Sequence, residues 1–169
     1  EVVSIDPMLE GFQTLPGFTE TPYLFGNLMA RIRMVTLYYY ANRDHRIVCG
    51  TSNRSEYMLG YSTKYGDSAA DIQPLLHLYK TDIYVAAREL GIPEPIITKV
   101  PSAGLWAGQS DEKEIGLSYT EIDSALQALE ENSWKADNPT EEKVLALVKK
   151  SGHKRMPAPS LLTGSQREG

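Results

Sequence analysis

An apolar run that changes abruptly into polar residues restricts how this chain folds more than any other feature. Ile-Val-Cys at 47–49 is followed at once by Gly-Thr-Ser-Asn-Arg-Ser-Glu. A short, continuously apolar run is typical of a parallel strand covered on both faces. We therefore predict a strand over 46–50, after which Ser52 or Asn53 caps a short helix that ends at Gly60. In α/β proteins, ligands bind in the crevice beyond the carboxyl ends of such strands.

Periodicity and capping signals predict four further helices. They cover 27–41, a segment around 83–90 that Gly91 ends, a segment opened by the capping box at 118–121, and a segment from Pro139 to a stop at Gly152. Prolines, glycines and weak periodicity predict loops over 1–26, 61–71 and 93–117. We expect residues 1–157 to form one part of a domain and 158–169 to be a disordered tail.

A second strand is expected over 72–76, so helices and strands alternate and the predicted fold class is α/β. Two strands are too few for an independent sheet. The shortfall predicts that an open parallel sheet is incomplete at the N-terminal side, and that upstream residues or a partner chain supply the other strands.

The helix expected over 27–41 is apolar on nearly every side except at Arg31 and Arg33. Such a helix is normally buried on more than one side, either in the core or in an interface between subunits. Buried arginines need anionic partners, and for Arg33 we expect a structural ion pair.

Composition excludes several classes of protein. The 169 residues carry a net charge of −5, which argues against a nucleic-acid partner. Cys49 is the single cysteine, so no disulfide forms within the chain, as expected for a cytoplasmic protein. No apolar stretch approaches the roughly 20 residues that span a bilayer, and residues 1–6 do not resemble a signal peptide.

The three histidines lack the spacing of a zinc site. Because the chain does not begin with methionine, we expect it to be processed or part of a longer protein.

Thr51, Glu56 and Lys80 are the candidate ligand-binding residues that stand out without any comparison. The carboxylate of Glu56 could hold Mg²⁺ while the hydroxyl of Thr51 meets a phosphate or a ribose. Lys80 opens a helix, where a cation opposes the helix dipole, and a phosphate partner would explain it. The alternative, that these residues bind no ligand, stays open. Serine, asparagine and glutamate are ordinary at helix starts, and lysines are ordinary on surfaces.

Several separated blocks together resemble one family, the NAD synthetases, over residues 20–157. The blocks are Gly26-Asn27-x-x-Ala30-Arg31-x-Arg33-Met34, Gly50-Thr51-x-Asn53-x-Ser55-Glu56, Tyr65-Gly66-Asp67 with Asp71, Pro74 and Lys80, Pro101-Ser102-Ala103-x-Leu105-Trp106-x-Gly108-Gln109-x-Asp111-Glu112, Gly116-x-x-Tyr119, and His153-Lys154-Arg155. The resemblance implies an open parallel sheet of the adenine-nucleotide alpha-hydrolase-like, N-type ATP-pyrophosphatase class. It also implies a homodimer in which the helix of Arg31 contributes to the interface.

The activity implied by the resemblance is the ATP-dependent amidation of deamido-NAD to NAD, with ammonia as nitrogen donor and AMP and pyrophosphate released. By position, the family's roles fall on nine residues. Thr51, Lys80 and Ser102 would contact ATP, Glu56 would bind Mg²⁺, and Arg31, Lys64, Asp71, His153 and Lys154 would hold deamido-NAD. No side chain is expected to act as a nucleophile.

One motif of the family, the phosphate-binding loop Ser-Gly-Gly-x-Asp-Ser, is absent from the 169 residues. We therefore expect this chain alone to be inactive unless that loop is supplied from elsewhere. Two alternatives follow: a non-catalytic nucleotide-binding or dimerisation fragment, or a different amidating or thiolating ATP pyrophosphatase. Neither ammonia nor glutamine is singled out by the sequence as the physiological donor.

Overall fold

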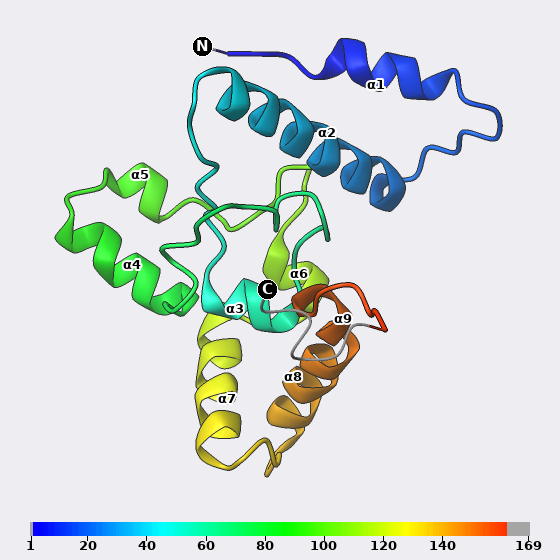
Figure 1. Ribbon diagram of the computed structural model, residues 1–169. Helices are drawn as coiled ribbons and strands as arrows, with labels where there is room; N and C mark the ends of the chain where they lie inside the picture. Colours follow the sequence, from blue (N-terminus) through cyan, green and yellow to red (C-terminus); the bar gives the residue numbers. More distant parts are fainter. Residues whose placement is uncertain (1, 162–169) are drawn as a thin grey trace.

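The structure, a computed structural model, describes residues 2–161 and arranges them as helices joined by long irregular segments (Figure 1). In chain order the described helices are α1 (Asp6–Gln13), α2 (Pro22–Arg43), α3 (Arg54–Leu59), α4 (Lys80–Glu89), α5 (Glu94–Ile97), α6 (Asp111–Ile115), α7 (Tyr119–Glu131), α8 (Pro139–Lys150) and α9 (Gly152–Arg155). The expected disordered tail over 158–169 lies mainly outside the described residues.

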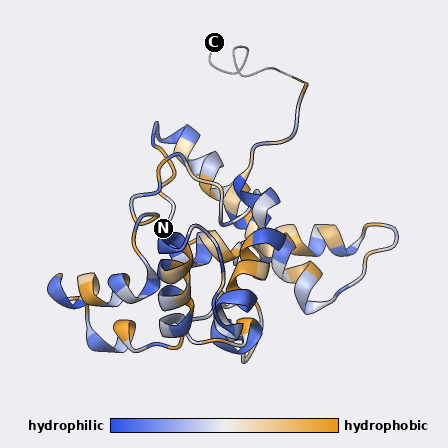
Figure 2. Cartoon of the chain, turned by 90° about the horizontal axis from the view of Figure 1, so that it is seen from below, coloured by the Kyte–Doolittle hydropathy of each residue, from blue (hydrophilic) through white to orange (hydrophobic). Residues whose placement is uncertain are grey.

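The hydrophobic core lies where α7 and α8 pack side by side as a hairpin against α3 (Figure 1). Ile122, Leu126 and Leu129 of α7 and Val144 of α8 are fully buried. The predicted starts of both helices are confirmed: Ser118 and Glu121 form a capping box on α7, and Pro139 lies in the first turn of α8. Apolar residues also occur along the helices outside this core (Figure 2).

The short helix after the apolar run is also confirmed as α3. Asn53 is its cap, because the Asn53 side chain accepts a hydrogen bond from the Glu56 amide at 3.0 Å. Gly60 ends the helix in the left-handed conformation at φ 66°, which glycine adopts at little cost.

We predicted strands over 46–50 and 72–76, and this prediction is wrong for the described residues. Between residues 2 and 161 the structure has one isolated parallel bridge in their place, between Cys49 and Ile72, with the Gly50 amide donating to the Ile72 carbonyl at 2.8 Å. Two short segments without flanking strands cannot sustain a sheet. Ile47 and Ile72 are correspondingly exposed. The predicted open sheet is therefore not formed by residues 2–161.

Two helices occupy the N-terminal region that we expected to be a loop. Pro7 lies in the first turn of α1 and Pro22 in that of α2, where the missing N–H costs nothing. Thr21 caps α2, since its hydroxyl accepts from the Leu24 amide at 3.2 Å. The expected cap, Asn27, lies inside the helix and donates to the Tyr23 carbonyl. Proline opens these helices and does not interrupt them.

The C-terminal boundaries also differ from expectation. The segment 93–117 is not entirely loop, because it contains the short helices α5 and α6. Gly152 does not stop the last helix but begins α9, which carries His153 and Lys154. Helices of four or five residues have little periodicity to detect, which explains why both features were missed.

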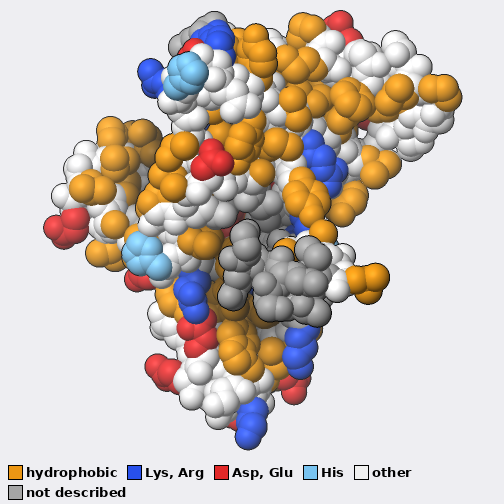
Figure 3. Space-filling model, viewed as in Figure 1, with side chains coloured by type: hydrophobic (Ala, Val, Ile, Leu, Met, Phe, Trp, Pro, Cys, Tyr) orange, Lys and Arg blue, Asp and Glu red, His pale blue; other side chains and the backbone are white. Residues whose placement is uncertain are grey.

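Only some of the apolar side chains of α2 are buried within the described residues. Gly26, Ala30 and Ile32 are buried, but Tyr23, Val35 and other large side chains on the helix are exposed. The burial on several sides that we expected is therefore absent from residues 2–161. Figure 3 shows hydrophobic side chains gathered over α1 and α2. Among the described helices, none is long and apolar enough to span a membrane.

The turn at Gly60 yields a test of the packing between α3 and α9. A Cβ at Gly60 would lie 2.2 Å from the Ser151 Cβ, whereas a Cβ at Gly91, with a similar φ of 69°, would meet nothing within 4 Å. We expect Gly91→Ala to lower the free energy of unfolding by about 1–2 kcal/mol, the cost of a left-handed non-glycine residue. Gly60→Ala should cost clearly more, because the clash adds to the strain.

Urea denaturation of the two variants measures the difference. Equal losses of stability in Gly60→Ala and Gly91→Ala would contradict the close contact between Gly60 and Ser151.

Candidate functional site

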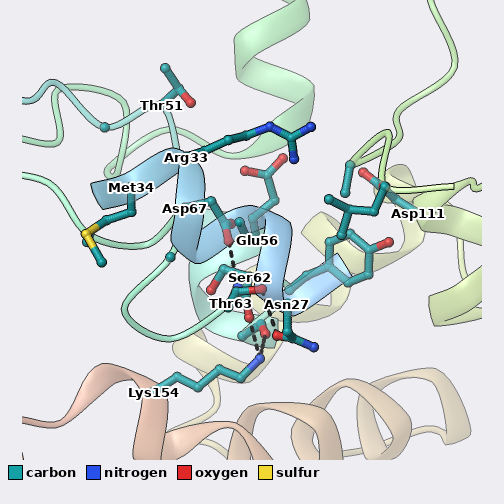
Figure 4. Close-up of a pocket in the computed structure, with 18 of the residues that line it drawn as sticks. Asn27, Arg33, Met34, Thr51, Glu56, Ser62, Thr63, Asp67, Asp111 and Lys154 are labelled. Atoms are coloured by element: carbon teal, nitrogen blue, oxygen red, sulfur yellow. Dashed lines mark hydrogen bonds between the residues drawn. The ribbon is translucent and has the colours of Figure 1, made fainter. Parts of the chain in front are cut away.

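A cavity of about 610 Å³ lies between α2, the start of α3 and the irregular segments that follow α3 and precede α6. Its apolar wall includes Met34 and Leu37 of α2 and Trp106. Its polar lining includes the charged side chains of Arg33, Glu56, Asp67, Asp111 and Lys154 (Figure 4). Lys80 and Glu114 line it as well. This volume and this mixture of apolar walls with a few charged groups suit a nucleotide-sized ligand.

An ion pair between Glu56 and Lys80 joins the starts of α3 and α4 inside the cavity. The Lys80 Nζ donates to the Glu56 Oε1 at 2.9 Å, and both side chains are largely buried. The other oxygen of Glu56 accepts from the Asn53 amide at 3.2 Å, as part of the capping box. The capping box thus fixes the Glu56 carboxylate, and the carboxylate offsets the unfavourable position of a cation at a helix N-terminus.

Lys80 is also held by an aromatic ring, because its Nζ lies 5.1 Å from the centre of the Tyr119 ring. A cation over a ring face at this distance is attracted by the ring's quadrupole. Tyr119 is buried, and burial raises the pKa of its hydroxyl group. The ammonium of Lys80 is therefore held from two sides.

A second group of cations surrounds the loop that follows α3. The Lys154 Nζ donates to the carbonyls of Gly60 and Ser62 at 2.7 and 2.5 Å, and burial lowers the pKa of this lysine. The Lys64 Nζ donates to the His153 carbonyl at 2.5 Å, and Arg31 donates to the Lys64 carbonyl at 3.3 Å. These bonds bring α2, the loop and α9 together.

The structure brings some of the predicted site residues together but not all of them. Thr51, Glu56, Lys80, Ser102 and Lys154 line the same cavity. Arg31, Lys64 and His153 do not line it but lie next to Lys154 through the bonds just described.

Asp71 also lies outside the cavity lining. Its carboxylate accepts from the Val48 amide at 2.7 Å and from the Tyr38 hydroxyl at 3.3 Å. In this structure the Asp71 side chain therefore supports the backbone just before the bridge at Cys49.

Asp111 also lines the cavity, and no role is predicted for it from the sequence. It is only 4% exposed, and its Oδ2 accepts from the Tyr119 hydroxyl at 3.1 Å. Its Oδ1 is buried and has no hydrogen-bond partner in the described part of the chain. Burial raises the pKa of this carboxyl group. The only signal in the sequence was its place in the block that ends at Glu112.

Arg33 was predicted to form a structural ion pair, and this prediction is wrong for residues 2–161. None of the ion pairs found there includes Arg33, which instead lines the cavity. The signal that could have found it was present, since a cation in an otherwise apolar helix needs an anionic partner, and a ligand can be that partner.

The arrangement is suited to binding a multiply charged ligand. Three cations, Arg33, Lys80 and Lys154, reach one hollow whose walls also carry carboxylates. Within the described residues, no group of three or more His, Cys, Asp or Glu side chains could hold a metal ion by itself. A metal at Glu56 would therefore need further oxygen ligands from phosphates and water, which is how Mg²⁺ is usually held at nucleotide sites.

Comparison with known proteins identifies relatives along nearly the whole chain. A family model described as NAD synthase matches residues 1–158. An NH3-dependent NAD(+) synthetase of Methanoregula boonei is 70% identical over 96% of this chain and 65% of the relative. One of Thermococcus kodakarensis is 44% identical over 92% of this chain and 65% of the relative.

Solved structures agree with these matches. An NMN synthetase of Francisella tularensis superposes with a TM-score of 0.84 at 40% identity, over 95% of this chain and 66% of that one. An NH3-dependent NAD synthetase of Campylobacter jejuni, solved with nitrate, gives 0.77 at 34% identity, over 95% and 64%. This chain thus spans about two thirds of the length of its relatives and shares the fold of the matching part. On this evidence, the chain belongs to the NAD synthase family.

Proposed function

We propose that this chain is the larger part of an ammonia-dependent NAD synthetase, which amidates deamido-NAD at the expense of ATP. The observation that carries the proposal is the cavity in which Thr51, Glu56 and Lys80 meet. Relatives at up to 70% identity carry the same activity in their names. A non-catalytic binding fragment is the less favoured alternative, because the cavity retains the charged groups that phosphate chemistry requires.

The chemistry explains why charged groups are needed. A carboxylate is a poor electrophile, so the nicotinate carboxylate oxygen first attacks the α-phosphorus of ATP, and pyrophosphate leaves. The nitrogen of ammonia then attacks the carbonyl carbon of the mixed anhydride, and AMP leaves with the former carboxylate oxygen. Negative charge gathers on the phosphates in the first step, and positioned cations stabilise it.

In this scheme Lys80 contacts the phosphates of ATP, and the hydroxyls of Thr51 and Ser102 donate to ATP nearby. Glu56 would hold Mg²⁺, which when bound neutralises phosphate charge. The donor set fits, since one carboxylate on a fixed helix turn leaves the remaining positions to phosphate and water. The ion pair between Glu56 and Lys80 supports this assignment, because it holds the anion and the cation on the same side of the cavity.

Deamido-NAD would be held by the cations around the loop after α3. Lys154 lines the cavity, and Arg31, Lys64 and His153 are bonded next to it. A dinucleotide that reaches all of them extends from the cavity along this loop. Asp71 is proposed as a further contact, although its carboxylate is engaged by the Val48 amide and the Tyr38 hydroxyl.

The protein is proposed to be a homodimer that pairs through α2. The large apolar side chains left exposed on this helix, such as Tyr23, Val35 and Tyr39, support this arrangement. Removing them from water would stabilise a dimer through the hydrophobic effect. We also infer a cytoplasmic location, as the single cysteine of the chain suggests.

A second candidate function is the synthesis of NMN from the corresponding mononucleotide acid. The observation that favours it is the likeness to the Francisella tularensis structure, which is described as an NMN synthetase. Both reactions amidate the same pyridine carboxylate, so the two candidates differ in the length of the substrate and not in the bond formed.

The first prediction compares this chain with a fusion that supplies the rest of the domain. The fusion joins the chain in frame to the part of the Methanoregula boonei relative that it does not cover. We expect the fusion to release AMP only with ATP, Mg²⁺, deamido-NAD and ammonia together, and the 169-residue chain to release none. Chromatography of AMP and NAD measures both.

Two results would contradict this expectation. Full activity of the chain alone would show that no further phosphate-binding segment is needed. A fusion that amidates the mononucleotide acid and leaves deamido-NAD unchanged would favour the second candidate function.

The second prediction concerns Glu56→Gln in the fusion. Glutamine at this position can still complete the capping box, so the fold and the dimer should persist. Turnover should fall by about 100-fold or more, as when one electrostatic group is removed from a transition state. Glu112→Gln is the matched control, because Glu112 also accepts a backbone amide, from Tyr119 at 2.8 Å, but does not line the cavity.

Steady-state kinetics at several Mg²⁺ concentrations separate the outcomes. If Glu56→Gln turns over like Glu112→Gln at saturating Mg²⁺, Glu56 is not a metal ligand.

A further inference from the structure

Asp123, in the second turn of α7, connects three helices through one buried carboxylate. It is 2% exposed. Its Oδ1 accepts from the Ser55 hydroxyl of α3, and its Oδ2 accepts from the Thr81 amide of α4 at 2.8 Å. A buried carboxylate is tolerated only where donors satisfy it, and here the donors come from two other helices.

Ser55 continues this connection to Lys80. The Ser55 side chain is fully buried, and its hydroxyl accepts from the Lys80 amide at 2.9 Å while it donates to Asp123. The first two amides of α4 are therefore held by Ser55 and Asp123. The cap residue of α4 itself, Tyr79, makes no side-chain capping bond. Two residues from other helices thus bind the first two amides of α4, while Asp82 of α4 itself accepts from the Tyr79 amide at 2.9 Å.

The consequence is that Lys80 is held by two consecutive residues of α3. Ser55 binds its amide, and Glu56 binds its ammonium at 2.9 Å. Because Asp123 accepts from both Ser55 and Thr81, it joins α3 to α4 beside the bonds that Arg54 makes to the Leu78 carbonyl and the Tyr79 hydroxyl, and it therefore contributes to how closely the two helices approach. The separation of these helices in turn determines where the Lys80 ammonium lies in the cavity.

We propose that Asp123 and Ser55 are positioning residues that place Lys80 for the binding of ATP. The proposal rests on the proposed function, since it takes Lys80 as an ATP contact. Neither Asp123 nor Ser55 lines the cavity, so they act on the ligand only through Lys80. A displacement of a catalytic group by about 1 Å can lower a rate 100-fold, so such positioning has measurable effects.

Asp123→Asn is the informative substitution, because it preserves size but removes one acceptor. Its amide oxygen can still accept from Thr81, but its NH₂ group then faces the Ser55 hydroxyl, which loses its acceptor. In the fusion we expect the KM for ATP to rise about tenfold, with the KM values for ammonium and deamido-NAD unchanged within about twofold. Ser55→Ala, which removes the other half of the connection, should give the same pattern.

Glu141→Gln is the matched control. Glu141 is likewise a buried carboxylate that accepts a backbone amide, from Asp137 at 2.7 Å, but it lies at the start of α8 outside the cavity lining. This variant should lower the melting temperature as Asp123→Asn does and leave the KM for ATP unchanged. The same KM change in both variants would overturn the proposal, because it would reflect general loss of stability. So would an unchanged KM for ATP in Asp123→Asn.

A double-mutant cycle with Lys80→Met separates this proposal from the proposed function. If Lys80→Met leaves the KM for ATP unchanged, the proposed role of Lys80 fails. If Lys80→Met raises it and Asp123→Asn raises it further by the same factor, the positioning role fails. We expect Asp123→Asn to add little once Lys80 is gone, since coupled residues are not additive.

Hydrogen exchange on the unaltered fusion provides a measurement that needs no variant to fold. We expect the amide hydrogens of Lys80 and Thr81 to exchange as slowly as those in the buried core of α7. Exchange as fast as in the short helix α5 would show that the connection through Ser55 and Asp123 is not maintained, and would overturn the proposal.

Discussion

The ion pair between Glu56 and Lys80 is the interaction on which the rest of the site depends. It brings a carboxylate fixed by the capping box of α3 against a cation that opens α4. A lysine at a helix N-terminus is unfavourable on its own, so its retention requires compensating anions. The protein supplies one anion in Glu56, and in the proposed function the phosphates of ATP supply the others.

The fold makes this pair possible by building its support from elements far apart in the sequence. The hairpin of α7 and α8 provides the hydrophobic core, and Asp123 on α7 reaches both α3 and α4. By contrast, large apolar side chains of α2 stay exposed, and the bridge at Cys49 has no flanking strand within residues 2–161. Within residues 2–161, the cavity residues on α3 and α4 are therefore firmly held, whereas α2 leaves much of its apolar surface uncovered.

Local signals in the sequence predicted the helices that have clear caps. The Asn53 cap and the Gly60 stop of α3 were both readable from the residues, as was the Ser118 start of α7. The strands were not, because an apolar run becomes a strand only if neighbouring strands are present to pair with it. Pro7 and Pro22 were wrongly predicted to lie in loops. Proline disrupts a helix when it lies in the interior but is well tolerated in the first turn, and the sequence alone does not distinguish the two positions. In the site, the sequence motifs correctly indicated Glu56 and Lys80 as cavity residues. The role of Asp123 depends on contacts between helices, which the spacing of residues along the sequence does not predict.

The most direct test of the central claim is a crystal structure of the fused domain with ATP and Mg²⁺. We expect triphosphate oxygens to lie within hydrogen-bond distance of the Lys80 Nζ, and a Glu56 oxygen to bind the metal. Phosphates bound elsewhere, with the Glu56–Lys80 pair unchanged and remote from ATP, would contradict it.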